Sequence, residues 1–531
     1  MADTVDEDRE HLHSLGYAQE LNRGMSTFSN FAISFSIISI LAGGFTSFWL
    51  GAAYGGPLLI TLGWLIVGMF ALFVGMSMGE ICSAYPTAGG LYFWSAKLAT
   101  KNAPLWSWFT GWFNFIGQIG VIASVDYALA NYVVRFVNLY SSNPEEPIIQ
   151  EKAINFFIVF LIMLLAHGLL NTFGVKLVRF LGDLSVWWHV VGVAVIFVVL
   201  FAGPDTKQPI SYLFQFQNNS PWSGGISTIY VFCIGFLLAQ YTITGFDASA
   251  HVSEETVGAR VSAPKAIVRS IYISAIAALV LNIGFLLAVP NVDGKDQLAA
   301  LTNFSILGPV NIFQAVLGSF AVKLLVRIST VGQFFCGLAS VTANSRMIYA
   351  FSRDGGLPGS NIWHKINPKT RTPTNAVWLG VVMSAIVGAL SLIQKDGYSV
   401  AFFALTGICV VGLYISYVIP IYLRLKNPNF QQGPWNLKGY SKIVGWISVA
   451  GVCFITILFF APLFPQWRWW SHDDINTANY TGPLIVLSFI AVGLWWVASA
   501  KKWFTGPKVQ GTPEELRAIE RELDALEHGS L

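Results

Sequence analysis

Two groups of small and polar residues interrupt long apolar stretches of this chain. Ala42-Gly43-Gly44 divides residues 29–50, and residues 242–247 (TITGFD) divide residues 226–251. Non-helical backbone at membrane depth is tolerated only where it is buried in protein or lines a cavity, because lipid cannot bond free N–H and C=O groups. Two such breaks favour a transporter that binds its solute at the breaks.

The breaks offer two kinds of polar group. A half-helix that starts after Gly44 points free N–H groups and a positive dipole end toward the middle of the membrane. Half-helices that end near Leu41 and Thr244 present free carbonyl groups. Because N–H groups suit a carboxylate and carbonyl groups suit an ammonium, we expect a small zwitterion such as an amino acid. Glycine is also common in membrane helices as a packing residue, which is the alternative for Gly43 and Gly44.

Membrane-spanning helices must position these breaks. Of 531 residues, 54% are hydrophobic and 11% are charged, and the mean hydropathy of +0.58 excludes a water-soluble domain. Apolar stretches predict twelve spans, which begin near Ser29, Pro57, Leu105, Ile154, Leu184, Ile226, Ile267, Val322, Asn375, Val400, Ile443 and Tyr480. The breaks then fall on spans one and six. These are equivalent positions in an all-α membrane protein built as a five-plus-five inverted repeat.

The expected organisation has three parts. Residues 1–28 form an N-terminal segment, residues 29–503 the transporter domain, and residues 504–531 a tail with a short helix. Within the domain, repeat one covers about 29–203, repeat two about 226–424, and two additional helices about 443–503. Lys and Arg are more frequent in the loops on the side of the N-terminus, which predicts that both termini are cytoplasmic. A Thr512-Pro513-Glu514-Glu515 capping box begins the tail helix.

Ionisable and amide side chains within spans are functional candidates, because burying them is costly. His189, on span five, is a candidate proton carrier, since an unperturbed histidine has a pKa of about 6.5. A histidine hydrogen-bonded within the bundle is the alternative. Asp126, on span three, could balance a cationic group or pair with a hydroxyl or backbone donor. The amides that could line a cavity or bridge helices are Asn114, Gln118 and Gln333.

Other polar residues are expected to be structural. Asp247 and Glu254 should pair within the protein more than contact a substrate, and His167 on span four should be structural. HExxH and GxxxxGK[ST] motifs are absent from the sequence, as are Cys/His clusters with metal-ligand spacing. We therefore expect no enzyme, no catalytic residue, no metal, no cofactor and no nucleic-acid partner.

Four segments resemble, in order, the amino-acid/choline transporter branch of the amino acid-polyamine-organocation permeases. They are LGYAQELNRGMSTFSNFAISFSIISILAGGF, GEICSAYPTAGGLYFWSA, ITGFDASAHVSEET and SRMIYAFSRDGGLP. The resemblance runs from about Leu15 to about Trp503, and it does not fix the substrate. It implies a fold in which spans one and six are broken helices around a central substrate site.

The resemblance also implies roles for individual residues. The N–H groups of Gly43 and Gly44 receive the substrate carboxylate, and the carbonyl groups near its amine belong to Ser39, Ile40 and Thr244. Tyr241, four residues before Gly245, matches an aromatic residue that covers the substrate from outside; a packing aromatic is the alternative. His189 matches a lysine that proton-coupled relatives carry at the position of a sodium ion. Ala42 stands where many members have glycine, which limits how closely a ligand can approach.

These features predict a proton symporter for GABA or a similar small amino acid, embedded in the lipid bilayer of the plasma membrane. A choline or polyamine carrier and an amino-acid exchanger are the alternatives within transport. A channel or a membrane sensor that does not transport is the alternative outside it. The sequence does not indicate which amino acid or amine is carried, or the oligomeric state.

Overall fold

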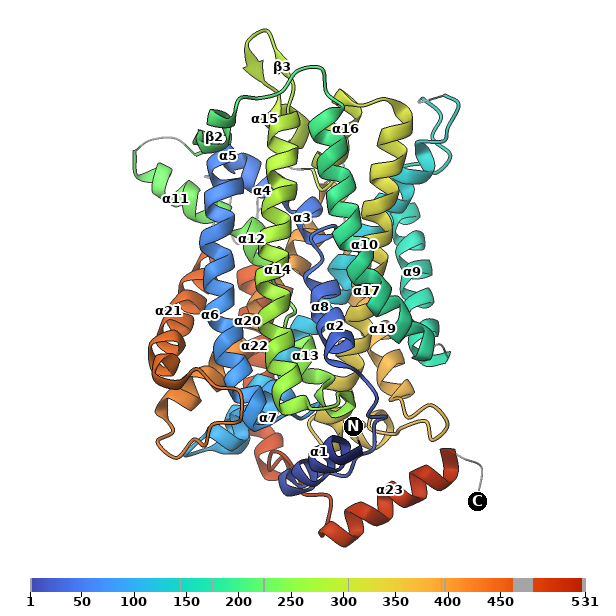
Figure 1. The fold of residues 1–531 in the computed structure, drawn as a ribbon, viewed down its shortest axis with the longest axis vertical. Helices are drawn as coiled ribbons and strands as arrows, with labels where there is room; N and C mark the ends of the chain where they lie inside the picture. The colour runs from blue at the N-terminus through green and yellow to red at the C-terminus, as the bar shows by residue number, and fades with distance from the viewer. Residues whose placement is uncertain are drawn as a thin grey trace.

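The computed structural model describes residues 2–143, 145–173, 175–222, 225–303, 305–392, 394–395, 398–461 and 481–527. Long helices run side by side along the molecule, and both termini lie at the same end (Figure 1). Within the described residues, eleven helices are long and apolar enough to cross a membrane. The expected all-α membrane class is therefore confirmed.

The helices fall into three groups. The long ones are α6 (Trp64–Ala84), α8 (Ala103–Asn138), α9 (Ala153–Phe173), α10 (Val175–Ala202), α14 (Ala259–Ala288), α17 (Ser319–Arg353), α19 (Thr374–Gly388), α20 (Val400–Lys426), α21 (Ser441–Phe460) and α22 (Thr481–Ala498). The interrupted ones are α2 (Thr27–Ile38), α3 (Gly43–Thr46) and α4 (Phe48–Ala53), followed later in the chain by α11 (Gly225–Gly235), α12 (Leu237–Thr242) and α13 (Ala248–His251). Connecting and terminal helices are α1 (Ala2–Leu15), α5 (Gly56–Leu58), η1 (Leu59–Gly63), α7 (Gly90–Leu98), η2 (Ile210–Phe214), η3 (Ser253–Glu255), α15 (Leu298–Thr302), α16 (Gly308–Val316), α18 (Ser360–Trp363), η4 (Ala389–Leu392), η5 (Lys438–Tyr440), η7 (Ala500–Lys502) and α23 (Pro513–Glu527).

The strands are short antiparallel pairs in the loops. They are β1 (Tyr54–Gly55) with β2 (Gln217–Asn218), β3 (Asn291–Val292) with β4 (Lys295–Asp296), and β5 (Gln394–Lys395) with β6 (Tyr398–Ser399). In the part of the chain that the structure describes, they form three separate two-stranded sheets. The bundle therefore depends on helix packing for its architecture.

The spans differ in detail from the sequence expectations. The sixth is represented by a shorter apolar helix, Thr228–Thr242, so the count of twelve and the inverted repeat stay predictions. The fifth was expected to begin near Leu184, whereas α10 begins at Val175. Its first turns carry Lys176, whose side chain is exposed, so the helix extends beyond its apolar part. Tyr480, where the twelfth span was expected to begin, lies outside the described residues.

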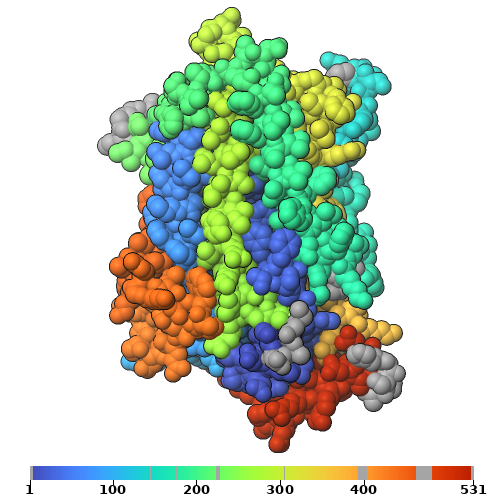
Figure 2. Space-filling model, viewed as in Figure 1, coloured from blue at the N-terminus to red at the C-terminus, as the bar shows by residue number. Residues whose placement is uncertain are grey.

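The outer face of the bundle is apolar. Figure 2 shows α6, α14 and α10 side by side on one face of the molecule. Large hydrophobic side chains on these helices are exposed, among them Met69, Ile276, Val280, Val191 and Val198. Such a surface suits contact with lipid, because soluble proteins rarely expose large contiguous apolar patches.

The two chain ends are tied together at one end of the bundle. The N–H of Lys508 donates to Asp354 Oδ1 (3.0 Å), and the N–H of Gln510 donates to the carbonyl of Gly16 (2.9 Å). The side-chain oxygen of Gln510 accepts the N–H of Ala18 at 2.8 Å. The tail therefore contacts both the N-terminal segment and the residue that follows α17, and it holds the two together.

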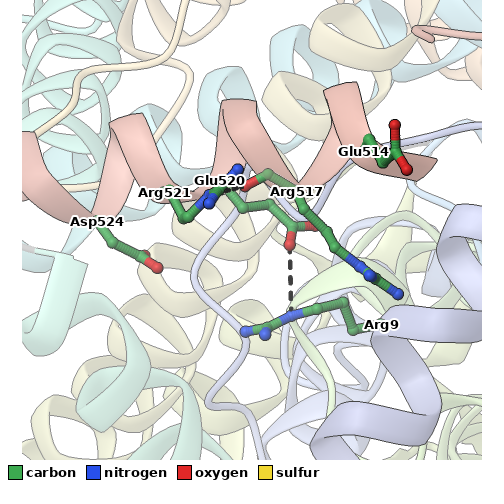
Figure 3. Close-up of a pocket in the computed structure, with 6 residues that line it drawn as sticks. All are labelled: Arg9, Glu514, Arg517, Glu520, Arg521 and Asp524. Carbon is green, nitrogen blue, oxygen red and sulfur yellow. Dashed lines mark hydrogen bonds and ion pairs between the residues drawn. The ribbon is translucent and has the colours of Figure 1, made fainter. Parts of the chain in front are cut away.

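The tail helix α23 begins with the expected capping box. The Thr512 N–H donates to Glu515 Oε2 (2.7 Å), and the Glu515 N–H donates to Thr512 Oγ1 (3.4 Å). These bonds hold the pKa of Glu515 below its ordinary value. Between α1 and α23 lies a cavity of about 390 Å³ (Figure 3), and its lining residues are Arg9, Glu514, Arg517, Glu520, Arg521 and Asp524. Three of these side chains are basic and three are acidic, Arg9 Nε lies 3.6 Å from Glu520 Oε2, and the cavity is far from the breaks (Figure 1).

Candidate functional site

The first break lies between α2 and α3. α2 ends at Ile38, three residues earlier than the expected end near Leu41. The Ser39 carbonyl accepts the N–H groups of Ala42 (2.9 Å) and Gly43 (3.0 Å), which closes a tight turn before the helix resumes. The expectation that the second half-helix starts after Gly44 is therefore corrected, because Gly43 is its first residue.

The two glycines of this break have different surroundings. A Cβ on Gly43 would lie 2.9 Å from the Cα of Thr242, so α3 packs directly on α12. A Cβ on Gly44 would meet nothing closer than the Cγ2 of Thr242, at 4.0 Å. Among the described residues, no hydrogen-bond partner is found for the Gly44 N–H or for the Ile40 carbonyl. The Gly44 N–H and the Ile40 carbonyl are therefore among the backbone groups of the break that could bind a solute.

The second break lies between Thr242, where α12 ends, and Ala248, where α13 begins. Gly245 has φ +92°, a conformation that side chains rarely adopt, and a Cβ there would lie 2.3 Å from Ile37 Cγ2. The Thr244 hydroxyl donates to the Gln240 carbonyl at 2.6 Å. The second break therefore packs on the last turn of α2, and the two breaks adjoin.

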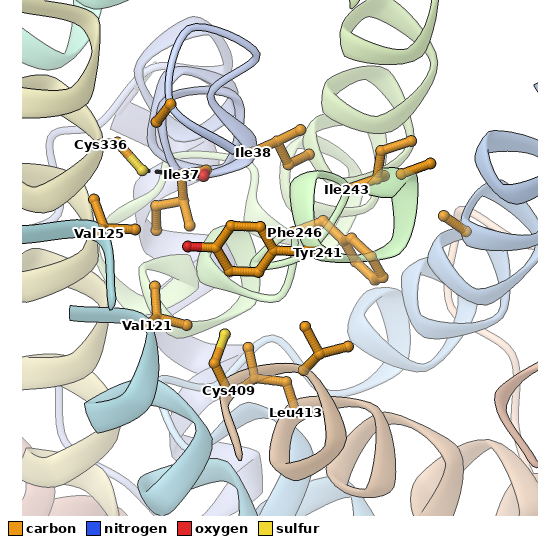
Figure 4. Close-up of a cluster of buried hydrophobic side chains, with 14 of the residues drawn as sticks. Ile37, Ile38, Val121, Val125, Tyr241, Ile243, Phe246, Cys336, Cys409 and Leu413 are labelled. Carbon is orange, nitrogen blue, oxygen red and sulfur yellow. Dashed lines mark hydrogen bonds between the residues drawn. The ribbon is translucent and has the colours of Figure 1, made fainter. Parts of the chain in front are cut away.

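Tyr241 lies in an apolar wall beside the breaks. Figure 4 shows its ring between the second break and α8, near Ile37, Val121 and Val125. The side chain is 7% exposed, and its hydroxyl donates to Ser124 Oγ at 3.4 Å. The ring thus joins the core of the bundle in this closed conformation.

The carboxylate of Asp247 is surrounded by donors from other helices. Oδ1 accepts the hydroxyl of Tyr417 (2.6 Å), and Oδ2 accepts the side-chain amides of Asn114 and Gln118 (both 3.1 Å). The His251 Nε2 lies 3.3 Å from the same Oδ2. Asn114 and Gln118 therefore bridge α8 to the second break, and Asp247 pairs within the protein as expected.

His189 touches the first break directly. Its Nδ1 lies 2.8 Å from the carbonyl of Ser185, so this nitrogen carries a hydrogen. Its Nε2 lies 2.7 Å from Oγ of Ser39, the residue at the end of α2. A neutral ring accepts the serine hydroxyl at Nε2, and a charged ring donates to it. The contact links the charge of the ring to the residue whose carbonyl closes the turn.

Asp126 pairs with His167, the histidine that is expected to be structural. Asp126 Oδ2 lies 3.1 Å from His167 Nδ1, and both side chains are fully buried. The sequence left two kinds of partner open for Asp126, a cationic group or a hydroxyl or backbone donor, and the contact is with the titratable ring of the next span. Gln333 donates to Ser329 Oγ at 3.2 Å, and Ser329 in turn donates to the Leu41 carbonyl at 2.8 Å. Gln333 therefore supports the first break through Ser329.

Both ends of the site are closed. Toward the end opposite the termini, Phe45 packs against Tyr132, Phe285 and Phe313, with ring centroids 5.2–6.2 Å apart. Toward the termini, two buried ion pairs join α17 to η3, Arg353 to Glu254 (3.0 Å) and Arg346 to Glu255 (2.7 Å). The expected pairing of Glu254 is confirmed.

Sequence reasoning missed several of these partners. Tyr417, Arg346 and Arg353 lie far along the chain from the groups that they contact, whereas His251 lies only four residues from Asp247. The ITGFDASAHVSEET segment did carry a signal, because four of its residues are ionisable in an otherwise apolar region. The spacing of Asp247 and His251 places them one helical turn apart.

Comparison with known proteins agrees with this geometry. A family model described as amino acid permease matches residues 25–497. The chain is 40% identical to the amino-acid permease BAT1 of Arabidopsis thaliana, covering 95% of this chain and 96% of that one. It is 31% identical to a GABA-specific permease of Saccharomyces cerevisiae (94% and 86% covered) and 30% identical to a putative polyamine transporter of Candida albicans (96% and 91% covered).

Proposed function

The chain belongs to the amino acid permease family, and we propose that it is a secondary active transporter that carries a small amino acid together with a proton. The observation that carries this proposal is the pair of adjoining breaks, where the Gly44 N–H and the Ile40 carbonyl have no partner in the described residues. A carboxylate would bind the donor and an ammonium the acceptor. The carbonyl of Thr244 and the ring of Tyr241 would complete the site, with Tyr241 covering the substrate from outside.

The charges around the breaks favour a neutral zwitterion such as GABA. A polyamine carries several ammonium groups and would require further buried carboxylates. Asp247, beside the second break, is already engaged by Tyr417, Asn114, Gln118 and His251. A choline or polyamine carrier is the second candidate, because one similar protein is named a putative polyamine transporter.

His189 is the proposed coupling residue. A charged ring would donate to Ser39 Oγ and stabilise one arrangement of the first break, and a neutral ring would release it. Alternating access between the two closed ends would then move substrate and proton together. An exchanger would use the same site without net proton movement.

The proposed setting is the cell membrane, with both termini in the cytoplasm. The loops at the end of the N-terminus hold more Lys and Arg, and both termini lie at that end (Figure 1). The transporter domain would cover residues 29–503, flanked by cytoplasmic segments 1–28 and 504–531.

The decisive experiment is uptake of labelled amino acids, choline and polyamines into proteoliposomes with imposed pH gradients. We expect a small amino acid to accumulate against its own gradient when the outside is acidic. His189→Ala should lose this accumulation and keep substrate exchange, whereas His364→Ala, in a loop beyond α17, should behave as wild type. Facilitated equilibration without accumulation would indicate a channel, and undiminished accumulation by His189→Ala would exclude His189 as the coupling residue.

A further inference from the structure

Two buried histidines each face a buried aspartate, and their hydrogen bonds differ in one respect. His167 reaches Asp126 through Nδ1 (3.1 Å), and its Nε2 has no partner among the described residues. His251 reaches Asp247 Oδ2 through Nε2 (3.3 Å), and its Nδ1 lies 3.0 Å from the carbonyl of Ala88. Both ring nitrogens of His251 therefore face an oxygen.

This geometry fixes the number of protons at His251. A carbonyl oxygen only accepts, so Nδ1 must carry a hydrogen that points at Ala88. A neutral ring would then turn the lone pair of Nε2 toward the carboxylate oxygen, and two acceptors would face each other. A further proton on the line between Nε2 and Oδ2 removes this conflict, whichever of the two atoms holds it.

The other partners of Asp247 favour placing that proton on the ring. Three donors, from Tyr417, Asn114 and Gln118, point at the carboxylate, and such donors favour its ionised form. An ionised Asp247 beside a charged His251 is a neutral pair. The same carboxylate beside a neutral ring would be a buried net charge, which is strongly unfavourable in a low-dielectric interior.

Within the described residues, the charged groups near the pair do not neutralise the Asp247 carboxylate. The basic groups of α17 that lie at the same end, Arg346 and Arg353, are bound by Glu255 and Glu254. The groups that α2 directs at residues 246–249 are the neutral side chains of Asn30 and Ser34. Tyr417 of α20 and the two amides of α8 are uncharged donors, and α14 makes no hydrogen bond or ion pair to residues 247–251 within the described part of the chain.

We propose that Asp247 and His251 together form a second proton-binding site, which holds one proton in the closed conformation and releases it to water when the end with the termini opens. The pair is built into the interrupted helix, with Asp247 at the start of α13 and His251 at its end. The bond to Ala88 joins this helix to the segment that precedes α7. Separation of these two segments would remove one acceptor from the charged ring and favour loss of the proton.

Ring spectra of the full-length protein test the site directly. With all eight histidines labelled with ¹⁵N, the signal that disappears in His251→Gln is assigned to the His251 ring. In the wild-type protein, this signal should show both ring nitrogens protonated near neutral pH. His167→Gln is the matched control: it identifies the signal of the His167 ring, which should not change in Asp247→Asn. Asp247→Asn should convert the His251 ring to the singly protonated form. An unprotonated Nε2 of His251 in the wild-type protein would overturn the proposal.

A second measurement uses the wild-type protein, in case neither His251→Gln nor His251→Asn folds. Amide hydrogen exchange of residues 87–90, corrected for its intrinsic pH dependence, should accelerate as the pH rises and the proton leaves. The sign follows from linkage, because a proton bound only in the closed state stabilises that state at low pH. Exchange that is independent of pH, or that slows with rising pH, would overturn the proposal.

The consequence for transport rests on the proposed function. Each coupled proton contributes about tenfold to the limiting accumulation for every pH unit of gradient, since a tenfold ratio corresponds to about 1.4 kcal/mol. His251→Gln should therefore accumulate about tenfold less than wild type per pH unit, and His167→Gln should be unchanged. Equal accumulation by His251→Gln and wild type would contradict the proposal that the Asp247–His251 pair releases a proton during transport. Failure of the wild type to respond to any pH gradient would refute the proton symport itself, while the ring spectra still decide the site.

Discussion

Removing the hydroxyl of Ser39 should shift the pH dependence of uptake. Ser39 Oγ lies 2.7 Å from His189 Nε2, and the Nδ1 of the ring is occupied by the Ser185 carbonyl. In Ser39→Ala, Nε2 loses its partner in both charge states of the ring. The charged ring loses more, because a hydrogen bond to a charged group is worth about 1.5–3 kcal/mol and a neutral one about 0.5–1.5 kcal/mol.

The difference between those two losses sets the size of the shift. It is roughly 1 kcal/mol, which corresponds to about 0.7 of a pH unit at about 1.4 kcal/mol per unit. Because the charged form loses more, a lower pH is needed to load the ring, and the midpoint of uptake should move to the acid side. Initial rates of substrate uptake into proteoliposomes, measured against external pH, give this midpoint.

Two variants make the result specific to His189. Ser39→Thr keeps the hydroxyl and should keep the midpoint of the wild type. Ser34→Ala removes another buried hydroxyl of α2, which bonds to Ser249 and the Phe246 carbonyl, and should leave the midpoint unchanged. An unchanged or alkaline midpoint in Ser39→Ala would refute the assignment of His189 as the residue that loads the proton.

Three further predictions concern the site and the topology. Gly44→Leu should abolish substrate binding, because a Cβ at Gly44 meets only the Cγ2 of Thr242, at 4.0 Å, and the larger side chain would cover the free N–H; binding of wild-type strength, measured by thermal shift with substrate, would place the site elsewhere. Arg353→Met leaves Glu254 buried without its partner, which costs about 3–5 kcal/mol, so hydrogen exchange of residues 16–25 should accelerate; unchanged exchange would mean that the pair does not hold this end closed. Tags at the termini should be reached only from the cytoplasm, and a tag between Asp293 and Asp296 only from outside; termini on opposite faces would contradict the repeat.

The breaks could be predicted from sequence because their cause is local. Glycine and small polar residues within an apolar stretch weaken the helix wherever the chain folds. The exact end of α2 could not be predicted, because it depends on the Ser39 carbonyl, which turns back to bond Ala42 and Gly43. Residue type alone does not reveal which carbonyl will close such a turn.

The partners of buried charges could not be predicted for a different reason. Asp247 is contacted by Asn114 and Tyr417, which lie 133 and 170 residues away along the chain. Apolar spans carry little information about which faces meet, so a sequence identifies the buried ionisable group and not its neighbour. His167 illustrates this limit, since its position on span four was recognised and its contact with Asp126 was not.

The tie between the tail and the N-terminal segment has a consequence for biosynthesis. Lys508 and Gln510 follow α22 in the chain, yet they hold Asp354 and Gly16 in place. Every membrane helix that the structure describes precedes them and is therefore synthesised before they are. This closure therefore forms only after residues 508–510 have been synthesised, and a chain that stops after α22 would lack the contacts that hold its N-terminal segment.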